Sequence, residues 1–307
     1  MSSSVVKEIQ QGNIKSLARA ISLVENESDG FEGLLQSLPA KTNSPIIGIT
    51  GPPGAGKSTM VDALISKLSA GEKKVAVLCV DPSSPFNFGA LLGDRIRMST
   101  WYTKPNVFIR SLATRGSLGG LHPKIIEITE LLQAAAFDYI IVETVGVGQS
   151  EVEIAGLADV TVVVVVPEAG DEVQTMKAGL MEIADIFVVN KADRPNADIF
   201  VNNLRLMLAP TFHSHKDEVA IIKTVASENI GIDELAEKID EVLKQHHQND
   251  HRFWLMTERA YQLISKRRTK DLDKMEMRKK IEGQYKKGEF NLYKFVQEED
   301  DGPRTLP

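Results

Sequence analysis

Short runs of apolar residues, many of them β-branched, recur between residues 45 and 227, and longer stretches with helical spacing separate them. Most of these runs are apolar at every position rather than at alternate positions, which is typical of strands buried on both faces of a sheet. The predicted strands are 46–50, 74–80, 107–112, 138–144, 160–166, 186–190 and 220–225. Together they predict an α/β fold with an open, mostly parallel central sheet and helices on both faces.

Both ends of the chain have helical patterns without predicted strands. Residues 1–44 place apolar side chains at helical intervals until polar residues and Pro39 break the pattern. A closing helix is expected after Gly231, and a charged helical segment follows over residues 253–286. The expected organisation is an N-terminal helical extension at 1–44, an α/β domain at 45–250, and a C-terminal helical arm and tail at 251–307.

Charge and composition narrow the classes of partner. The net charge is -6, from 42 acidic and 36 basic residues, so the chain has no excess of positive charge to bind a nucleic-acid backbone or an anionic membrane. The longest apolar run, 160–167, is far shorter than the roughly 20 residues of a membrane-spanning helix. The first residues lack a secretory pattern, and Cys79 is the single cysteine. We therefore expect a cytoplasmic protein without a nucleic-acid or membrane partner.

A glycine-rich turn follows the first predicted strand. It matches G-x-x-x-x-G-K-[ST], with the required strand before it and a helical pattern after it, which favours a phosphate-binding loop over an ordinary turn. Glycines let successive backbone N–H groups point at phosphate oxygens, and the helix start adds the positive end of its dipole. Lys57 is expected to contact the β- and γ-phosphates, and Ser58 to bind Mg²⁺. The predicted nucleotide-binding residues of the turn are Gly51, Pro52, Pro53, Gly54, Ala55, Gly56, Lys57, Ser58 and Thr59.

Three acidic residues are candidate magnesium ligands, because this hard cation prefers oxygen and usually binds one or two carboxylates beside phosphate and water. Asp81 directly follows the predicted strand 74–80 and Glu143 lies at the end of 138–144, and ligands of open parallel sheets bind beyond the carboxyl ends of strands. Asp94 follows a glycine in the segment LLGDRIRM. Its alternative role is to cap the helix that starts there.

The stretch after Glu143 contains two glycines, Gly146 and Gly148, directly behind an apolar strand. Such a loop suits a rearrangement, in which the N–H of Gly146 contacts the γ-phosphate and is released by hydrolysis. An ordinary strand-to-helix turn is the alternative.

A second short motif indicates which base is bound. Asn190 ends the predicted strand 186–190 and begins the motif N-K-A-D, in which Lys191 and Asp193 come after the strand. A carboxylate accepts two hydrogen bonds, and guanine offers two adjacent donors where adenine presents an acceptor. Asp193 therefore favours guanine, although NKAD alone is also compatible with a plain loop. The N–H groups of Val225, Ala226 and Ser227, at the end of the last predicted strand and just after it, are expected to form a second wall of the base pocket.

With these residues in place, the sequence resembles the MeaB/ArgK family of GTPases, within the larger group of metallocentre-assembly GTPases. The resemblance rests on long blocks: GNIKSLARAISLVEN, GPPGAGKST, VDPSSPFNFGALLGDRIRM, RSLATRGSLGGL, FDYIIVETVGVGQSEVEIA and PEAGDEVQTMKAGLMEIADIFVVNKAD. The segment after residue 252 is helical but has no sharp motif.

The resemblance implies a homodimeric GTPase that binds GTP or GDP with Mg²⁺ and acts as a chaperone for an adenosylcobalamin-dependent acyl-CoA mutase, usually methylmalonyl-CoA mutase. Adenosylcobalamin then belongs to the partner. By motif match, the nucleotide and magnesium roles fall on Lys57, Asp81, Asp94 and Glu143. Gln174 and Lys177 match a segment through which the partner activates hydrolysis; from the sequence alone, Lys177 reads as a solvated helix residue.

The chain has no pattern of an internal arginine finger or a water-orienting glutamine, although Gln149, Gln174, Arg95 and Arg115 stay open. We therefore expect slow intrinsic hydrolysis that a partner accelerates. Three alternatives remain: a nickel metallochaperone GTPase, a kinase or ATPase linked to amino-acid transport, and a nucleotide-binding scaffold without hydrolysis. The histidines near 246–251 are sparse for a metal site.

Overall fold

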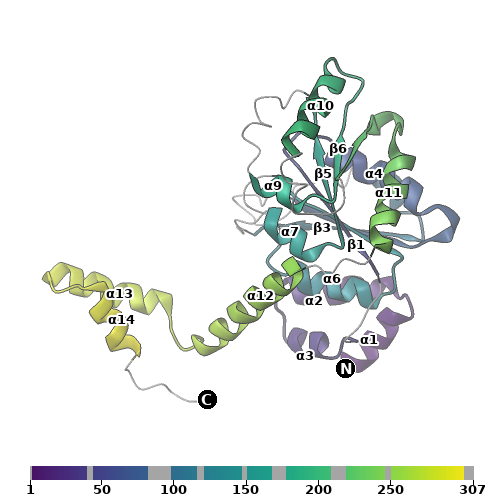
Figure 1. The fold of residues 1–307 in the computed structure, drawn as a ribbon. Coiled ribbons are helices and arrows are strands. Elements are labelled where there is room, and N and C mark those ends of the chain that lie inside the picture. Colours follow the sequence, from purple (N-terminus) through teal and green to yellow (C-terminus); the bar gives the residue numbers. More distant parts are fainter. Residues whose placement is uncertain are drawn as a thin grey trace. The chain divides into compact units, whose positions relative to one another are not determined.

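The protein is described from a computed structural model (Figure 1). The described residues are 2–39, 44–81, 98–115, 121–146, 151–167, 178–208, 219–245 and 250–300. At its centre lies a seven-stranded sheet in the order β3-β2-β4-β1-β5-β6-β7, and every pair of neighbouring strands is parallel. The strands are β1 (Ile46–Thr50), β2 (Val75–Asp81), β3 (Val107–Ala113), β4 (Tyr139–Glu143), β5 (Val160–Val165), β6 (Ile186–Val189) and β7 (Ala220–Lys223). The predicted α/β fold with a parallel sheet is confirmed.

Five strands in the middle of the sheet, β2, β4, β1, β5 and β6, are buried at every position. This matches their uninterrupted apolar sequence, because helices cover both faces of a parallel sheet. The edge strands β3 and β7 keep partly exposed positions. Strand β1 lies in the centre of the sheet, between β4 and β5. The loop that follows it therefore starts at the middle of the row formed by the carboxyl ends of the strands.

Helices pack on the two faces of the sheet (Figure 1). Helices α4 (Lys57–Leu68) and α11 (Ile232–Lys244) pack against each other and share one apolar core with the strands. Helices α6 (Ile125–Ala134) and α7 (Glu151–Leu157) contact β4 and β1 respectively. Two further helices, α9 (Ala178–Ile183) and α10 (Ala197–Leu208), lie on either side of β6 in the sequence.

Three N-terminal helices pack on one another, and α2 packs on α6. They are α1 (Ser2–Gln10), α2 (Ile14–Glu25) and α3 (Phe31–Gln36). The side chain of Asn13 caps α2 by accepting hydrogen bonds from the N–H groups of Lys15 and Ser16. Buried apolar residues of α2, such as Leu17 and Ile21, explain the predicted helical spacing.

Glu25, at the end of α2, ties these helices to β3. Its carboxylate accepts hydrogen bonds from the guanidinium groups of Arg110, at 2.7 Å, and Arg115, at 3.2 Å. Arg115 also donates to the backbone oxygen of Glu25 at 2.8 Å and to the side chain of Asn26 at 2.9 Å. In this structure the guanidinium of Arg115 is therefore bound to the end of α2.

His122 lies near this cluster and is 2% exposed. Its Nδ1 accepts a 3.0 Å hydrogen bond from the N–H of Lys124. Burial lowers the pKa of His122 to about 4, and the neighbouring charge of Glu25 only partly opposes this. The imidazole is therefore neutral near pH 7.

The C-terminal helices are α12 (Asp250–Arg268), α13 (Lys274–Lys287) and α14 (Leu292–Asp300). The charged helical pattern predicted over 253–286 forms two helices, α12 and α13, and Asp273 caps the second by accepting hydrogen bonds from the N–H groups of Met275 and Glu276. Phe295 is 2% exposed and its ring lies 6.2 Å from that of Phe290.

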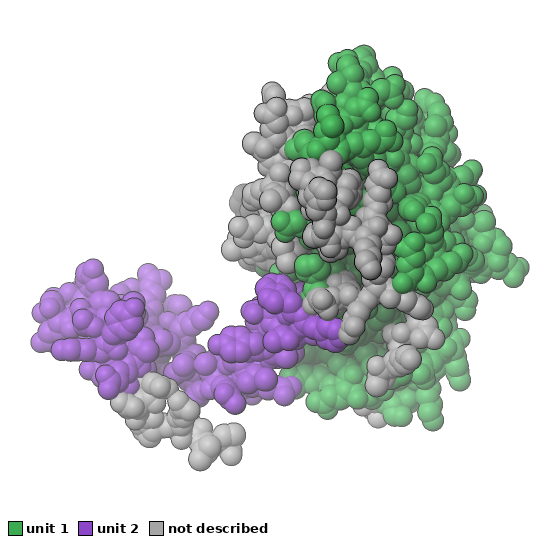
Figure 2. Space-filling model, in the orientation of Figure 1, with its two compact units in different colours: residues 1–252 green, residues 253–307 purple. Residues whose placement is uncertain are grey.

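The chain forms two compact units, residues 1–252 and 253–307 (Figure 2). The three predicted domain boundaries stay a prediction. Among the helices of the described ranges, none is both long and apolar enough to cross a bilayer.

Candidate nucleotide site

The glycine-rich turn connects the central strand β1 to α4, as its motif requires. Gly56 caps the start of α4 with a φ of +90°, and the helix begins with Lys57 and Ser58. The carboxyl ends of β1, β2, β4 and β6 all point to the same edge of the sheet, because these strands are parallel. The candidate residues that follow these strands therefore gather at this edge.

Lys57 is 7% exposed and its ammonium lies inside the loop. It donates hydrogen bonds to the backbone oxygens of Gly51, at 2.9 Å, and Pro52, at 3.1 Å. These carbonyls hold the positive charge within the turn whose N–H groups are expected to bind phosphate. An ammonium at this point is suited to neutralising the charge that develops on transferring phosphoryl oxygens.

Gly146, three residues after β4, lies against the same ammonium. Its φ is +85°, and a Cβ built on it would come within 2.3 Å of both Lys57 Nζ and the oxygen of Gly51. Only glycine fits this position without moving Lys57. The loop after β4 therefore touches the phosphate loop at the residue that was predicted to sense the γ-phosphate.

Ser58 and Glu143 meet across the site. The Ser58 hydroxyl donates a 2.7 Å hydrogen bond to Glu143 Oε1, and Glu143 is 5% exposed. Asp81 is 6% exposed and lies two residues beyond Cys79, which pairs with Glu143 in the register of β2 and β4. A hydroxyl and two carboxylates are the hard oxygen donors that Mg²⁺ prefers, so the side chains present fit this ion.

A hydroxyl pair joins the strands that carry these residues. The side-chain oxygens of Thr50 and Thr144 lie 2.9 Å apart, and the N–H of Thr144 donates to the oxygen of Ile49 at 3.0 Å. Both threonines are 1% exposed. Neither was predicted from the sequence, because each reads as the end of a buried strand.

Asn190 connects the phosphate loop to the loop after β7. Its Nδ2 donates to the oxygen of Ala55 at 2.9 Å, and its Oδ1 accepts from Ala226 N–H at 3.1 Å. Lys191 Nζ donates to the oxygen of Gly54 at 2.8 Å. The first two residues of the NKAD segment, Asn190 and Lys191, thus contact the phosphate loop.

The expected base-binding groups are at the same end of the sheet. Asp193 is exposed, as a group that receives a ligand must be, and Ser227 is exposed as well. The N–H of Val225 donates to the oxygen of Ile230 at 3.1 Å, and that of Ala226 to Asn190. These two N–H groups are therefore engaged within the protein, and the wall of the base pocket stays a prediction.

Several predicted residues fall outside the described ranges: Asp94, Arg95, Gln149, Gln174, Lys177 and the histidine pair at 246–247. The roles of Asp94, Gln174 and Lys177 stay predictions, Arg95 and Gln149 stay open, and the histidine pair was not expected to bind a metal. Sequence reasoning missed Thr224, which is 0% exposed and donates to Asn190 Oδ1 at 3.1 Å. The available signal was a hydroxyl residue near the end of the predicted strand 220–225, directly before the residues Val225 to Ser227 that were assigned to the base pocket.

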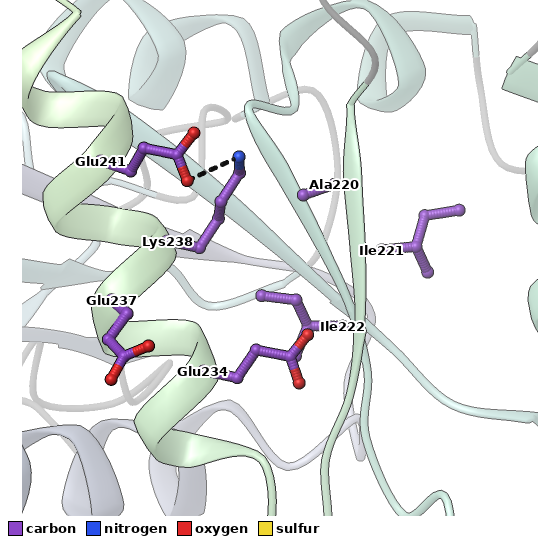
Figure 3. A pocket seen from close by; sticks show the side chains of 7 residues that line it. All are labelled: Ala220, Ile221, Ile222, Glu234, Glu237, Lys238 and Glu241. Carbon is purple, nitrogen blue, oxygen red and sulfur yellow. Dashed lines mark ion pairs between the residues drawn. The ribbon is translucent and has the colours of Figure 1, made fainter.

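A separate pocket of about 400 Å³ lies between β7 and α11 (Figure 3). Ala220 and Ile222 face the helix, whereas Ile221 points away from it. Glu234, Glu237 and Glu241 line this pocket together with Lys238. None of the predicted nucleotide-binding residues lines it, and its excess of carboxylates would repel phosphate.

A parallel sheet whose central strand leads through this loop into a helix defines the class of P-loop nucleoside triphosphatases. The family model described as "Methylmalonyl Co-A mutase-associated GTPase MeaB" matches residues 17–280. The chain belongs to this MeaB family and is a GTP hydrolase.

Individual relatives agree with this assignment. A Pyrococcus abyssi protein, provisionally assigned as a GTPase, is 43% identical over 99% of this chain and 94% of its own length. GTPase ArgK of Escherichia coli is 41% identical over 62% of this chain and 59% of its own length. A fused isobutyryl-CoA mutase of Geobacillus kaustophilus is 36% identical over 63% of this chain, but only 19% of that protein is matched.

A solved structure supports the fold over nearly the whole chain. The crystal structure of an LAO/AO transport system kinase has a TM-score of 0.65 and 27% identity, and the match covers 97% of this chain and 95% of that one. The resemblance noted from the sequence blocks is thus confirmed at the level of the family.

Proposed function

We propose that this GTPase is a chaperone and switch for an adenosylcobalamin-dependent acyl-CoA mutase, with methylmalonyl-CoA mutase as the first candidate. Two observations support a mutase as the client. The matching family model is described as mutase-associated, and in the Geobacillus protein a segment similar to this chain is fused to an isobutyryl-CoA mutase. Two activities fused in one chain commonly act together, and the separate proteins then tend to associate.

The observation that carries the switch is the contact between Gly146 and Lys57. The loop after β4 approaches the group that is expected to bind the γ-phosphate, so loss of that phosphate changes the contacts of this loop. A partner that binds this loop in only one nucleotide state would then respond to whether GTP or GDP is bound. In this proposal GTP binding gates cofactor loading into the mutase and protects the mutase from inactivation.

The proposed chemistry is transfer of the γ-phosphoryl group to water. Lys57 and the helix start hold the phosphates, Ser58, Asp81 and Glu143 are suited to hold magnesium, and Asp193 selects guanine. When bound, the magnesium ion neutralises charge on the phosphate oxygens. The roles of Asp94, Gln174 and Lys177 in hydrolysis and its activation belong to the same proposal.

We further propose a cytoplasmic homodimer. Support for the dimer comes from α12, where Phe253, Trp254 and Ile264 are 60%, 55% and 50% exposed. Large apolar side chains exposed on one helix favour an interface with a second protein surface.

The test is GTP hydrolysis by the purified chain, alone and with each of three proteins: methylmalonyl-CoA mutase, isobutyryl-CoA mutase and an enzyme that uses no cobalamin. We expect slow turnover alone and an increase of about tenfold or more with the client mutase only. Lys57→Ala is the matched control, since it should remove both rates. Rapid turnover that no mutase changes would contradict the proposal.

A second measurement tests cofactor loading. Transfer of adenosylcobalamin to the apo-mutase is followed by its absorbance, with GTP or with a non-hydrolysable analogue. Loading should depend on which nucleotide is present. Equal loading with both nucleotides and without the chain would exclude the gating role.

Phosphoryl transfer to a transport protein, in addition to hydrolysis, is a second candidate, favoured by the similarity to the solved LAO/AO transport system kinase. The acceptor of the phosphoryl group in this second reaction is a protein side chain. Radiolabelled γ-phosphate would then appear on protein as well as in free phosphate.

A further inference from the structure

Strand β7 forms one edge of the central sheet. Within the part of the chain that the structure describes, no strand pairs with its outer side. Thr224, directly after β7, donates its N–H to the oxygen of Val189 in β6 at 2.9 Å. Because alternate residues of a strand bond to the same neighbour, the backbone of Ile222 also faces β6, and the N–H and C=O of Ile221 point to the open edge. The edge therefore offers main-chain groups to an added strand.

The pocket of about 400 Å³ lies between this edge and α11 (Figure 3). Glu234, Glu237 and Glu241 line it from positions i, i+3 and i+7 of the helix, so they lie on one helical face, and all three are exposed. We call these three residues the acidic stripe. Lys238, the one basic residue of the lining, pairs with Glu241 at 2.9 Å. The lining therefore keeps an excess of negative charge beside the edge of β7.

The charge of the acidic stripe determines which partner fits. Carboxylates repel a nucleic-acid backbone or an anionic membrane and attract lysine and arginine side chains. A second copy of this chain would bring the same acidic stripe beside its own β7, so like charge opposes pairing of two β7 edges. Ala220 and Ile222 face the helix and offer an apolar floor to the aliphatic stems of lysine or arginine. A basic segment of a different protein therefore fits this surface best.

We propose that the edge of β7 and the acidic stripe form a docking surface for an extended, basic segment of a partner protein, which joins the sheet as a further strand. Main-chain hydrogen bonds to Ile221 supply affinity. Basic side chains at every second position of the segment lie over α11 and supply selectivity, because alternate residues of a strand face the same side. None of the predicted nucleotide-binding residues belongs to this surface, and the inference holds whether or not the partner is a mutase.

The experiment measures binding of the peptide acetyl-KVKVKV-amide to the full chain by calorimetry. Two peptides serve as comparisons: acetyl-EVEVEV-amide, which reverses the charge, and the fully N-methylated form of the basic peptide, which has no backbone donors. We expect the basic peptide to bind and each comparison peptide to bind at least about tenfold more weakly. No binding of the basic peptide at about 1 mM would overturn the proposal. Equal binding of the N-methylated peptide would overturn the added strand.

Variants of the chain locate the peptide. Ile221→Pro removes an N–H that faces the open edge and leaves the bonds between β7 and β6 in place. It should weaken peptide binding by about tenfold, whereas Ile221→Val, which keeps the N–H, should stay within about twofold. The double variant Glu234→Lys with Glu237→Lys should also weaken binding by about tenfold, because attraction becomes repulsion. Equal affinity in Ile221→Pro and Ile221→Val, or no effect of the charge reversal, would overturn the proposed surface.

GTP turnover and thermal unfolding show whether each variant is folded. Turnover should stay within about twofold in all of them, since the changed residues lie outside the predicted nucleotide site. If Ile221→Pro unfolds, the N-methylated peptide still decides the question, because it tests backbone pairing on the unchanged chain. Higher salt should weaken binding of the basic peptide, since the charges of the acidic stripe are exposed. Binding that does not depend on salt would exclude the acidic stripe from recognition.

Discussion

The hydroxyl of Ser58 donates a 2.7 Å hydrogen bond to Glu143, 85 residues further along the chain. The two groups come together because β1 and β4 are parallel neighbours, with Ile49 paired to Glu143, and α4 begins just beyond β1. The Ser58 hydroxyl can give up this hydrogen bond and bind a cation through its oxygen instead. Such a hydroxyl is suited to a magnesium site.

Ser58→Ala should therefore weaken magnesium-dependent hydrolysis. We expect the magnesium concentration for half-maximal activity to rise by about tenfold or more, because one oxygen ligand is lost. The measurement is a magnesium titration of phosphate release at saturating GTP. Ser58→Thr is the matched control, since the motif accepts either hydroxyl residue, and it should stay close to the unchanged protein. Equal magnesium dependence in all three chains would remove Ser58 from the metal site.

Gly146→Ala tests the contact between the loop after β4 and Lys57. The added Cβ would lie 2.3 Å from Lys57 Nζ, so the ammonium or the loop must move. We expect kcat to fall by about 100-fold, the scale seen when one preorganised charge-stabilising group is misplaced. Gly33→Ala is the control, because nothing lies within 4 Å of a Cβ at that helical position. A Gly146→Ala chain with normal kcat would show that this loop takes no part in hydrolysis.

Asp193→Ala should reduce the preference for GTP over ATP by a factor of about 10³ or more, because the acceptor for the two guanine donors is lost. The ratio of kcat/KM for the two nucleotides is the quantity to measure. Asp198→Ala is a suitable control on the neighbouring helix, where the exposed Asp198 side chain pairs with Lys223 at 2.8 Å. Unchanged preference in Asp193→Ala would exclude this carboxylate from base recognition.

His122 should make the folded protein sensitive to acid. Its pKa is about 4 when folded and 6.5 in the unfolded chain, so between these values the unfolded chain binds the additional proton. The free energy of unfolding should therefore fall as pH decreases from 6.5 to 4, by about 3 kcal/mol in total from this residue. Urea unfolding at a series of pH values measures the slope.

His122→Asn is the reference chain for this measurement, since an asparagine oxygen can still accept from Lys124 N–H and does not titrate. The slope between pH 6.5 and pH 4 should be smaller in this variant. Arg110, Arg115, Lys124 and Glu25 act on the same imidazole, and all four stay in place in both chains. Parallel slopes would mean that His122 is not the group responsible.

Glu25→Gln should weaken the attachment of α2 to β3 and to the residues that follow β3. Removing this charge leaves two partly buried guanidinium groups, of Arg110 and Arg115, without their carboxylate. The expected loss is about 2 kcal/mol in the free energy of unfolding. Asp233→Asn is the control, because its ion pair with Lys67 is exposed and should contribute less than about 1 kcal/mol. A loss in Glu25→Gln no larger than in the control would show that the cluster adds nothing to stability.

The elements that could be predicted are those whose sequence pattern is formed by adjacent residues of the chain. Each buried strand is a continuous apolar run, and the turn from Gly51 to Ser58 is recognisable because its chemistry depends on adjacent residues. That Ser58 and Glu143 approach each other followed from the direction of parallel strands, although their role as metal ligands stays a prediction. The family was recognised from sequence blocks that extend over most of the chain.

Contacts between distant segments could not be predicted in the same way. Arg115 and Glu25 are 90 positions apart, and nothing in the sequence near either residue indicates its partner. Thr224 was missed for a related reason, since a threonine at a strand end has the same local pattern whether or not its hydroxyl is used. The division between α12 and α13 depends on one capping side chain, Asp273, within a stretch of similar charged residues.

The paired hydroxyls of Thr50 and Thr144 have a mechanical consequence. Thr50 is the last residue before the phosphate loop, and Thr144 is the first after β4. The first residues of both loops are thus fastened to one buried point, which ties the start of the phosphate loop to the start of the loop after β4. In the proposed switch, a displacement caused by loss of phosphate would therefore have to occur beyond this point and not in the strands behind it.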